Sequence, residues 1–141
     1  MASKRNNHYT NGLIRGYRSG LESSLAEQIE SIGLPPNYET HKMPYTKPET
    51  KHVYTVDFAL RKKDGDIMFI ETKGRFTLED RKKMVLIKEQ YPHYDIRFIF
   101  TNSRGKINKG SKTTYAMWCD KKGFQYADKT IPDEWIAELD T

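Results

Sequence analysis

Hydrophobic residues recur along this chain with two spacings, every three or four residues in some stretches and every second residue in others. The wider spacing is typical of one face of a helix, and the narrower one of a half-buried strand. Helical spacing with start and stop signals predicts helices at 19–32, 77–90 and 113–122, and a last helical turn around Trp135. The first helix opens with a Ser-x-x-Glu capping box that begins at Ser19.

Strand patterns occupy the stretches between these helices. We expect strands at 38–45, 52–60, 66–73, 95–101 and 124–127. The turn residues 63–65 make the second and third of them a β-hairpin. The run 95–101 is almost continuously apolar, which is typical of a strand covered on both faces, so it is expected near the centre of the sheet. The order α-β-β-β-α-β-α-β predicts a mixed α/β fold, a central mixed β-sheet flanked by helices.

Two segments fall outside this pattern. Residues 1–17 are basic and lack apolar periodicity, and are expected to form a flexible N-terminal arm on a single domain at 18–141. The stretch from Pro44 to Pro48 is extended and bounded by prolines, which suit the centre of a sheet poorly. We expect a connecting segment around residues 44–50.

Composition narrows the classes of protein. The 141 residues are 36% hydrophobic, without a run of about 18 apolar residues, so no membrane span is expected. The N-terminus shows no secretory signal, which favours the cytoplasm. A single cysteine, Cys119, permits no internal disulfide and no cysteine-rich zinc site, so any metal is expected to be held by oxygen.

Positive charge is concentrated in two runs that contain no acid. The chain has 24 Lys and Arg against 19 Asp and Glu, a net charge of +5. The runs are residues 1–20 and 97–112, and a basic run flanking carboxylates favours a phosphate-bearing partner, although one such run alone is usually a solvated loop. With two bases of the 77–90 helix, the DNA-binding candidates are Lys4, Arg5, Arg15, Arg18, Arg81, Lys82, Arg104, Lys106, Lys109 and Lys112. The second run also contains Arg97.

Three charges lie inside apolar strand patterns. Glu71 and Lys73 are two residues apart and therefore share a face of their strand, and Asp57 lies in the preceding strand of the hairpin. A hairpin loop of odd length centred on Asp64 would set Asp57 directly opposite Glu71, whereas a two-residue turn of Asp64 and Gly65 would put them on opposite faces. The chemistry favours the odd loop.

Paired carboxylates of this kind suit a divalent cation. Two carboxylates about 5 Å apart repel each other unless a cation lies between them, and oxygen ligands suit Mg²⁺ or Mn²⁺. A lysine beside such a site can orient a water or stabilise charge on a phosphate, which indicates phosphodiester hydrolysis. The alternative is a surface ion pair between Glu71 and Lys73, the commoner fate of an isolated E-x-K. The additional acid, the shared face and the basic surroundings favour the metal site.

The pattern D-(x)n-E-x-K on a β-hairpin, preceded by a helix bearing a glutamate, resembles the PD-(D/E)xK nuclease superfamily. An ordered set of stretches over nearly the whole chain is similar, more specifically, to the phage endonuclease I family of Holliday-junction resolvases. These stretches are Arg18–Glu22, Tyr54–Phe58, Glu71–Gly74, Asp80–Lys83, Lys109–Ser111, Phe124–Lys129 and Ile131–Ile136. Two departures are Val56, where the motif usually has proline, and a longer hairpin turn at 61–64.

The resemblance implies a metal-dependent, junction-resolving endonuclease with a restriction-endonuclease-like core and an intertwined homodimer. Glu22, Asp57, Glu71 and Lys73 fall on the catalytic positions, the first three as metal ligands with the backbone carbonyl of Thr72. In the family the glutamate of the first helix comes from the other subunit, and the 44–50 segment matches the bridge between the two halves. A phage-encoded enzyme of this kind would act in the host cytoplasm.

Two other functions remain as alternatives at this point. One is a sequence-specific nicking or homing endonuclease built on the same core. The other is a non-catalytic DNA-binding module, for which the basic runs would suffice. The hairpin carboxylates would then have no purpose, because without a metal they repel phosphate.

Overall fold

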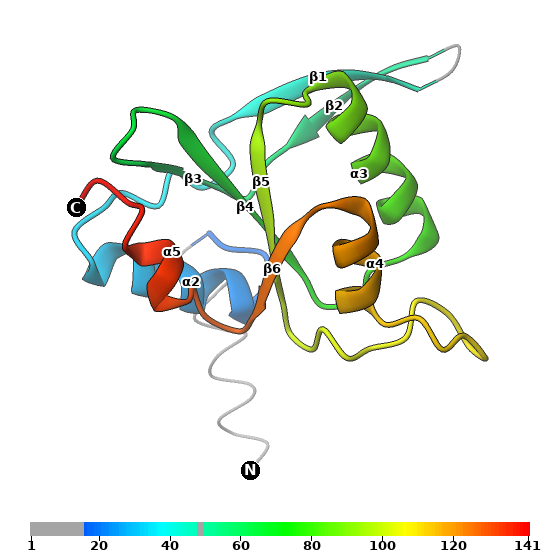
Figure 1. The fold of residues 1–141 in the computed structure, drawn as a ribbon. Coiled ribbons are helices and arrows are strands. Elements are labelled where there is room, and N and C mark those ends of the chain that lie inside the picture. The colour runs from blue at the N-terminus through cyan, green and yellow to red at the C-terminus, as the bar shows by residue number, and fades with distance from the viewer. Residues whose placement is uncertain (1–15, 48–49) are drawn as a thin grey trace.

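The computed structural model describes residues 16–47 and 50–141. Its core is a four-stranded β-sheet. The strands run in the order β3 (Phe58–Arg61), β4 (Ile67–Lys73), β5 (Asp95–Phe100) and β6 (Gln125–Asp128). The β3 strand is antiparallel to β4, and the remaining pairs are parallel, as Figure 1 shows. The mixed α/β prediction is confirmed, and the apolar strand at 95–100 is an interior strand, as expected.

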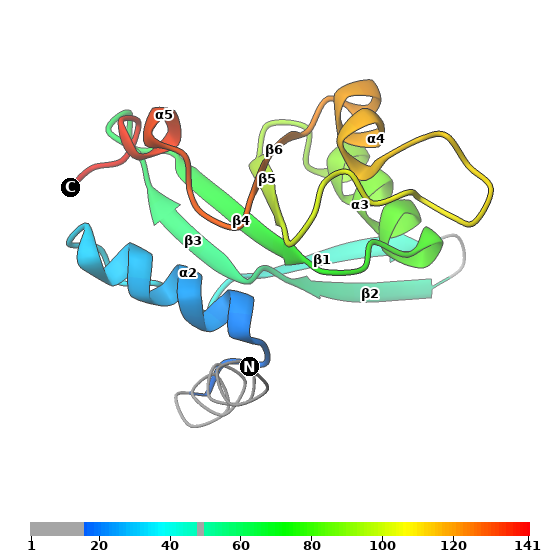
Figure 2. The ribbon, with the colours of Figure 1, turned by 90° about the horizontal axis from the view of Figure 1, so that it is seen from below.

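Helices cover both faces of this sheet. The helices α3 (Leu78–Gln90) and α4 (Tyr115–Lys122) pack on one face, and α2 (Gly20–Ser31) and α5 (Asp133–Ile136) on the other (Figures 1 and 2). Successive strand residues alternate between the two apolar clusters: Phe69 faces α3 and α4, and Ile70 faces α2 and α5. Side chains at odd positions of β4, including 71 and 73, therefore point to the α3 side.

The helix ends follow the signals in the sequence. The Ser19 side chain accepts a hydrogen bond from the Glu22 N–H at 3.1 Å, which fixes the start of α2. A complete capping box between Thr77 and Asp80 starts α3, and Gly123 ends α4 in a left-handed conformation with φ of 81°. Within the ranges that the structure describes, no helix is long and apolar enough to cross a membrane.

The segment expected to be a connector forms a two-stranded antiparallel ribbon. The β1 strand (Lys42–Lys47) pairs with β2 (Thr50–Thr55), and Pro44 lies opposite Val53. A proline is tolerated here because a two-stranded ribbon leaves one edge of each strand unpaired. The ribbon is separate from the four-stranded sheet, which agrees with the expectation that this stretch suits the centre of a sheet poorly, and residues 48 and 49 lie outside the described chain.

Two strand predictions differ from the structure where the chain turns sharply. The strand expected from residue 38 begins at Lys42, because Asn37 and Glu39 adopt positive φ angles of 47° and 51°. The strand expected at 52–60 is broken into β2 and β3 at Val56 and Asp57, and the Val56 N–H donates to the His41 carbonyl at 3.1 Å. The break places Asp57 at the end of an edge strand.

The hairpin between β3 and β4 has the odd loop. Phe58 pairs with Ile70, and the Lys62 N–H donates to the Asp66 carbonyl at 2.8 Å across a three-residue loop. The third loop residue, Gly65, has φ of 92°, as hairpin loops of this length require. The predicted register is thus confirmed, and its continuation places position 57 opposite position 71.

The start of the described chain is already packed. Residues 1–15, with Lys4, Arg5 and Arg15, lie outside the described residues. Tyr17, which the sequence assigns to the basic arm, is buried and contacts the ring of Tyr38 edge-on at 4.6 Å.

Arg97 belongs to a different environment from the one its basic run predicts. Its side chain is only 3% exposed, and its guanidinium donates to Asp95 and to Glu138 through paired hydrogen bonds of 2.6–2.9 Å. It also lies over the ring of Trp135, 5.1 Å from the centroid. The residue is therefore a structural anchor for the C-terminal segment and not a phosphate contact.

This ion cluster should make the stability of the fold sensitive to acid. Hydrogen bonds from Arg97 hold the pKa of Glu138 below its usual range. Burial raises the pKa of Asp95, but hydrogen bonds from Arg97 and Lys62 outweigh it and leave the pKa lowered. A lowered pKa stabilises the fold above the unfolded-state value, about 4, and that stabilisation is lost as pH falls through the lowered value.

We expect Glu138→Gln to lower the free energy of unfolding by less than about 1 kcal/mol at neutral pH, because the Glu138 side chain is 42% exposed and water screens the pair. The loss should be smaller at an acid pH below the lowered pKa, where the wild-type carboxyl is also neutral. Urea unfolding at the two pH values measures the difference. Glu134→Gln, an exposed change in α5, serves as the control. An equal loss at both pH values would contradict the role of the charge.

Candidate metal centre and active site

Asp57 is the central residue of the site. It lies just before β3 and is 3% exposed. Its Oδ2 accepts hydrogen bonds from the Thr72 N–H at 2.9 Å and from the Thr72 hydroxyl at 2.8 Å. These two donors fix the carboxylate against β4, and its Oδ1 lies 3.7 Å from the guanidinium of Arg18.

Glu71 is buried beside Asp57, as the hairpin register predicts. Glu71 is 4% exposed, and its carboxylate accepts a hydrogen bond from the hydroxyl of the buried Tyr54 on β2. Burial, followed by the adjacent charge of Asp57, raises the pKa of Glu71 well above its usual range. Two buried carboxylates in contact need a proton or a cation between them, because their mutual repulsion is poorly screened.

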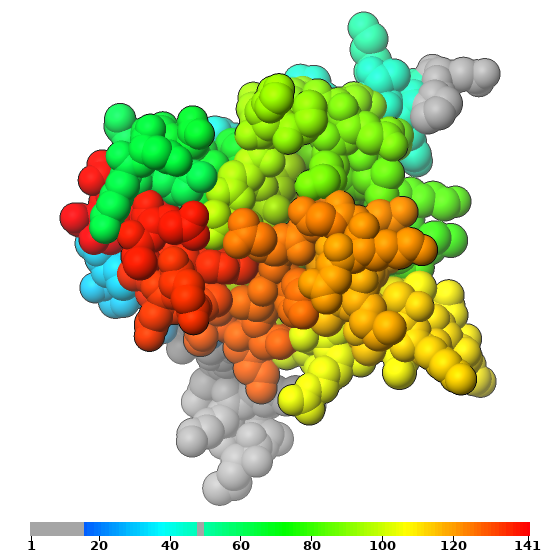
Figure 3. All heavy atoms as spheres, viewed as in Figure 1, coloured from blue at the N-terminus to red at the C-terminus, as the bar shows by residue number. Residues whose placement is uncertain are grey.

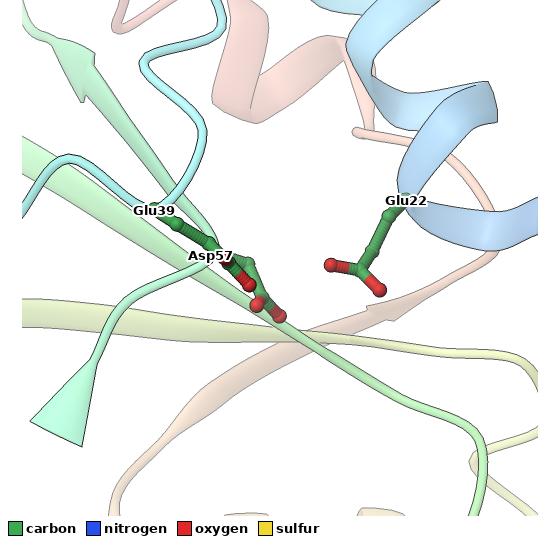
Figure 4. Close-up of side chains that lie close together, drawn as sticks. All are labelled: Glu22, Glu39 and Asp57. Atoms are coloured by element: carbon green, nitrogen blue, oxygen red, sulfur yellow. The ribbon is translucent and has the colours of Figure 1, made fainter. Parts of the chain in front are cut away.

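Glu22 reaches the same site from the opposite face of the sheet. Its carboxylate oxygen lies with those of Glu39 and Asp57 in a group whose members are all within 4.8 Å of one another, as Figure 4 shows. The Tyr38 hydroxyl donates to Glu22 at 2.5 Å, so the side chain is turned into the site. Burial raises the pKa of Glu22, and the charge of Asp57 adds to the shift.

Glu39 is the one carboxylate of this group that the sequence analysis did not find. Its N–H donates to the Asp57 carbonyl at 3.0 Å, and its carboxylate pairs with Arg18 at 2.7 Å. It lies in an irregular turn with no periodicity and no motif. The only signal in the sequence is the turn chemistry of the prolines and Asn37 that precede it.

Two basic side chains border the carboxylates. The Arg18 side chain is 70% exposed and lies beside Glu39 and Asp57. Lys73, on the same face of β4 as Glu71, has its Nζ 3.6 Å from Asp80 at the start of α3. The charge of Lys73 partly offsets the effects that raise the pKa of Glu71.

The donor set of the site suits a hard divalent cation. Asp57 lies together with three other carboxylates, and the four come from four separate segments of the chain. Oxygen atoms are the ligands that Mg²⁺ and Mn²⁺ prefer. The acidic cluster Glu22, Glu39 and Asp57 is thus a candidate metal site, with Glu71 in contact with its central member.

The structure divides the DNA-binding candidates by exposure. Arg18 borders the acidic site. Exposed on α3 and on the loop between β5 and α4 are Lys82, Arg104, Lys106, Lys109 and Lys112. Arg81 is buried and donates to the carbonyls of Phe76 at 2.7 Å and Ile107 at 3.1 Å, so it holds this loop against the start of α3.

The hydrogen bond from Tyr54 should strengthen metal binding. We expect Tyr54→Phe to weaken Mg²⁺ binding about tenfold or more, because Glu71 loses the donor that orients it. Isothermal titration calorimetry with Mg²⁺ measures the change, and Tyr94→Phe, at an exposed tyrosine, is the matched control. Unchanged affinity in the Tyr54 variant would show that Glu71 is oriented by other contacts.

Comparison with known proteins shows which family the chain resembles. The family model described as "Phage endonuclease I" matches residues 1–141. The chain is 47% identical over 125 residues to "Endonuclease I" of Escherichia phage T7, with 89% of this chain and 81% of that protein covered. It is 48% identical over 124 residues to "Endodeoxyribonuclease 1" of Enterobacteria phage T3, with 88% and 79% covered.

A solved structure titled "Structure of EndoMS-dsDNA2 complex" is more distant. It is 20% identical with a TM-score of 0.36 and covers 78% of this chain and 44% of that one, and we draw no functional conclusion from a likeness at this level. The match of the family model over the full length, with two relatives near 48% identity, is decisive. The chain belongs to the phage endonuclease I family.

Proposed function

We propose that this chain is a divalent-metal-dependent DNA endonuclease that resolves four-way junctions and cuts related branched DNA by phosphodiester hydrolysis. The observation that carries the proposal is the buried contact between Asp57 and Glu71, with Glu22 brought to the same place and Lys73 on the same strand face. Membership of the phage endonuclease I family supports the activity. The proposed location is the host cytoplasm.

The side chains of the site have different roles in hydrolysis. Asp57 and Glu71 would hold Mg²⁺, or Mn²⁺ in its place, with the Thr72 carbonyl, and Glu22 would complete a second position. When bound, the ion supplies Lewis-acid polarisation of the phosphate and a more acidic water. Thr72 keeps Asp57 in place through its N–H and hydroxyl, and Tyr54 and Tyr38 each orient one glutamate. Lys73 orients the attacking water and stabilises the charge that develops on the phosphate.

The exposed bases support recognition of DNA by shape. Lysine and arginine side chains reach phosphate oxygens, which look alike at every base pair but are arranged differently in a junction and in a straight duplex. The exposed lysines of the loop between β5 and α4 are of this kind. Contacts of this type favour branched DNA over a particular base sequence.

We also propose a homodimer in which the segment before residues 48–49 is exchanged between chains. Glu22 and Glu39 precede that point in the chain, and Asp57, Glu71 and Lys73 follow it. Exchange at the end of the β1–β2 ribbon could preserve the contacts of each site while one chain supplies Glu22 to the other. This arrangement agrees with the family resemblance of the 44–50 segment.

A comparison of substrates tests the function directly. The purified protein is incubated with Mg²⁺ and a four-way junction, and in parallel with linear duplexes of the same sequences. We expect cutting near the branch of the junction and little cutting of the duplexes. Preferential cutting of one linear sequence would favour the nicking or homing alternative, and binding without cutting would favour the non-catalytic module.

Single substitutions separate catalysis from binding. Asp57→Ala and Glu71→Ala should abolish cleavage and leave junction binding intact or stronger, because each removes a negative charge that repels phosphate. Lys73→Ala should slow the chemical step roughly 10²-fold or more. Single-turnover cleavage and gel-shift assays measure the two effects. Cleavage at near wild-type rate in either carboxylate variant would overturn the metal assignment.

Mixing of variants tests the exchanged dimer. Glu22→Ala and Asp57→Ala proteins are each expected to be inactive. Mixed under conditions that let subunits reassort, they should regain cleavage, because one site of each heterodimer would then have both carboxylates. Sedimentation establishes the oligomeric state, and a fully active monomer would refute the arrangement.

A further inference from the structure

A basic pocket lies beside the active site, between the start of α3 and the loop that joins β5 to α4. Its volume is about 560 Å³. Four cationic side chains line it: Arg75, Arg81, Lys106 and Lys109. No acidic residue belongs to the lining as far as the described residues define it, although Glu79 and Asp80 are close by in the chain. Figure 3 shows the loop, in yellow, projecting beside α4, in orange.

The walls of the pocket are held by specific contacts. Arg81 joins the two sides by donating to the carbonyls of Phe76 and Ile107. The Tyr115 N–H donates to the Gly105 carbonyl at 2.9 Å, and the loop packs so tightly there that a Cβ on Gly105 would lie 2.8 Å from the Tyr115 ring. The loop therefore keeps Lys106 and Lys109 at the pocket without a ligand.

The chain places this pocket close to the catalytic residues. Arg75 follows Lys73 by two residues, and the chain bends at Gly74 and Arg75, so their Cα atoms are at most about 7 Å apart. A DNA strand rises about 3.4 Å per nucleotide along the helix axis. A strand whose scissile phosphate lies at Lys73 would therefore bring another phosphate to the pocket within about two nucleotides.

Charge in the surroundings favours an anion in this pocket over a cation. Asp80, in the first turn of α3, is already engaged by Thr77 in the capping box and by Lys73. The guanidinium of Arg75 is exposed, as are the side chains of Lys106 and Lys109. Lys106 donates from its Nζ to the Lys112 carbonyl at 3.4 Å, so Arg75 and Lys109 are the exposed cations of the lining that suit contact with a backbone phosphate.

We propose that this pocket is a second phosphate site, which holds a backbone phosphate of the cut strand within two nucleotides of the scissile phosphate. Arg75 and Lys109 contact the phosphate, and Arg81 is a positioning residue that keeps the loop closed on it. The inference rests on the proposed function, because it takes the bound strand to be the one that is cut. In this proposal the second phosphate site fixes which phosphate of the DNA strand lies at Lys73.

The experiment combines charge removal in the protein with charge removal in the DNA. Cut positions are first mapped with Mg²⁺, and affinities for a four-way junction are then measured without Mg²⁺ by fluorescence anisotropy. Arg75→Gln and Lys109→Gln are compared with Lys121→Gln, an exposed lysine of α4 outside the pocket. Single neutral methylphosphonates are introduced at each phosphate of the arm that carries the cut.

We expect Arg75→Gln and Lys109→Gln each to reduce the slope of log K against log[salt] by about 0.9. A methylphosphonate at one position within two nucleotides of the cut should weaken junction binding by the wild type and by the Lys121→Gln variant. It should not weaken junction binding by the Arg75→Gln variant. Such non-additivity reports direct contact between that residue and that phosphate.

The outcomes separate the pocket from the function. If the protein cuts junctions but the effects of every methylphosphonate and of Arg75→Gln on binding affinity are additive, the proposed phosphate site is wrong and the proposed function stands. Coupling at a phosphate more than two nucleotides from the cut would also overturn it. If the protein cuts no DNA but Arg75→Gln and one methylphosphonate are non-additive, the pocket is still a phosphate site and the endonuclease proposal is wrong.

Discussion

The repulsion between two buried carboxylates, Asp57 and Glu71, is the constraint on which the rest of the site depends. Water cannot screen them, so the protein must supply donors and cations instead. Thr72 gives Asp57 two hydrogen bonds, Tyr54 gives one to Glu71, and Arg18 approaches from the solvent side. The pKa of Glu71 is nevertheless raised, first by burial and then by the charge of Asp57, so both burial and repulsion disfavour its charged form. A divalent cation would relieve the repulsion, which is why this acidic cluster is a candidate metal site.

The sheet brings these groups together because the strand containing Asp57 is broken. A residue inside a continuous strand projects to one face only, but Asp57 lies beyond the end of an edge strand and is contacted by side chains from both faces. Glu71 reaches it from the α3 side, and Glu22 reaches it from α2 on the other side. The backbone hydrogen bonds that Val56 and Asp57 make with His41 and Glu39 hold the break open. The irregular turn before β1 is thus as important to the site as the hairpin itself.

Local rules predicted most of the fold, and they failed where a distant contact decided the outcome. The starts of α2 and α3, the end of α4 and the hairpin register follow from a few residues each, since capping and turn chemistry act over short distances. The β1–β2 ribbon depends on pairing between strands that appear unsuited to a sheet in the sequence. Arg97 looks like part of a basic loop, and only the return of the C-terminal segment puts Glu138 beside it. In the same way, Asp57, Glu71 and Lys73 were found from strand spacing, whereas only the turn residues before Glu39 mark its segment and none of them marks it as a ligand.

The two tyrosine contacts have a consequence for assembly. Tyr38 and Glu22 both precede residues 48–49, and Tyr54 and Glu71 both follow them, so each glutamate is oriented by a tyrosine from its own side of that connection. The interactions across the connection include those made to Asp57, by Glu39 through its backbone and by Arg18 through its side chain. They also include the bond from the Val56 N–H to the His41 carbonyl and the pairing of β1 with β2. Each half of the site therefore carries its own oriented glutamate, and the contacts across the connection align both halves on one aspartate. This division suits a site whose halves come from two chains as well as one built from a single chain, because no orienting hydrogen bond to a glutamate has to be rebuilt during exchange.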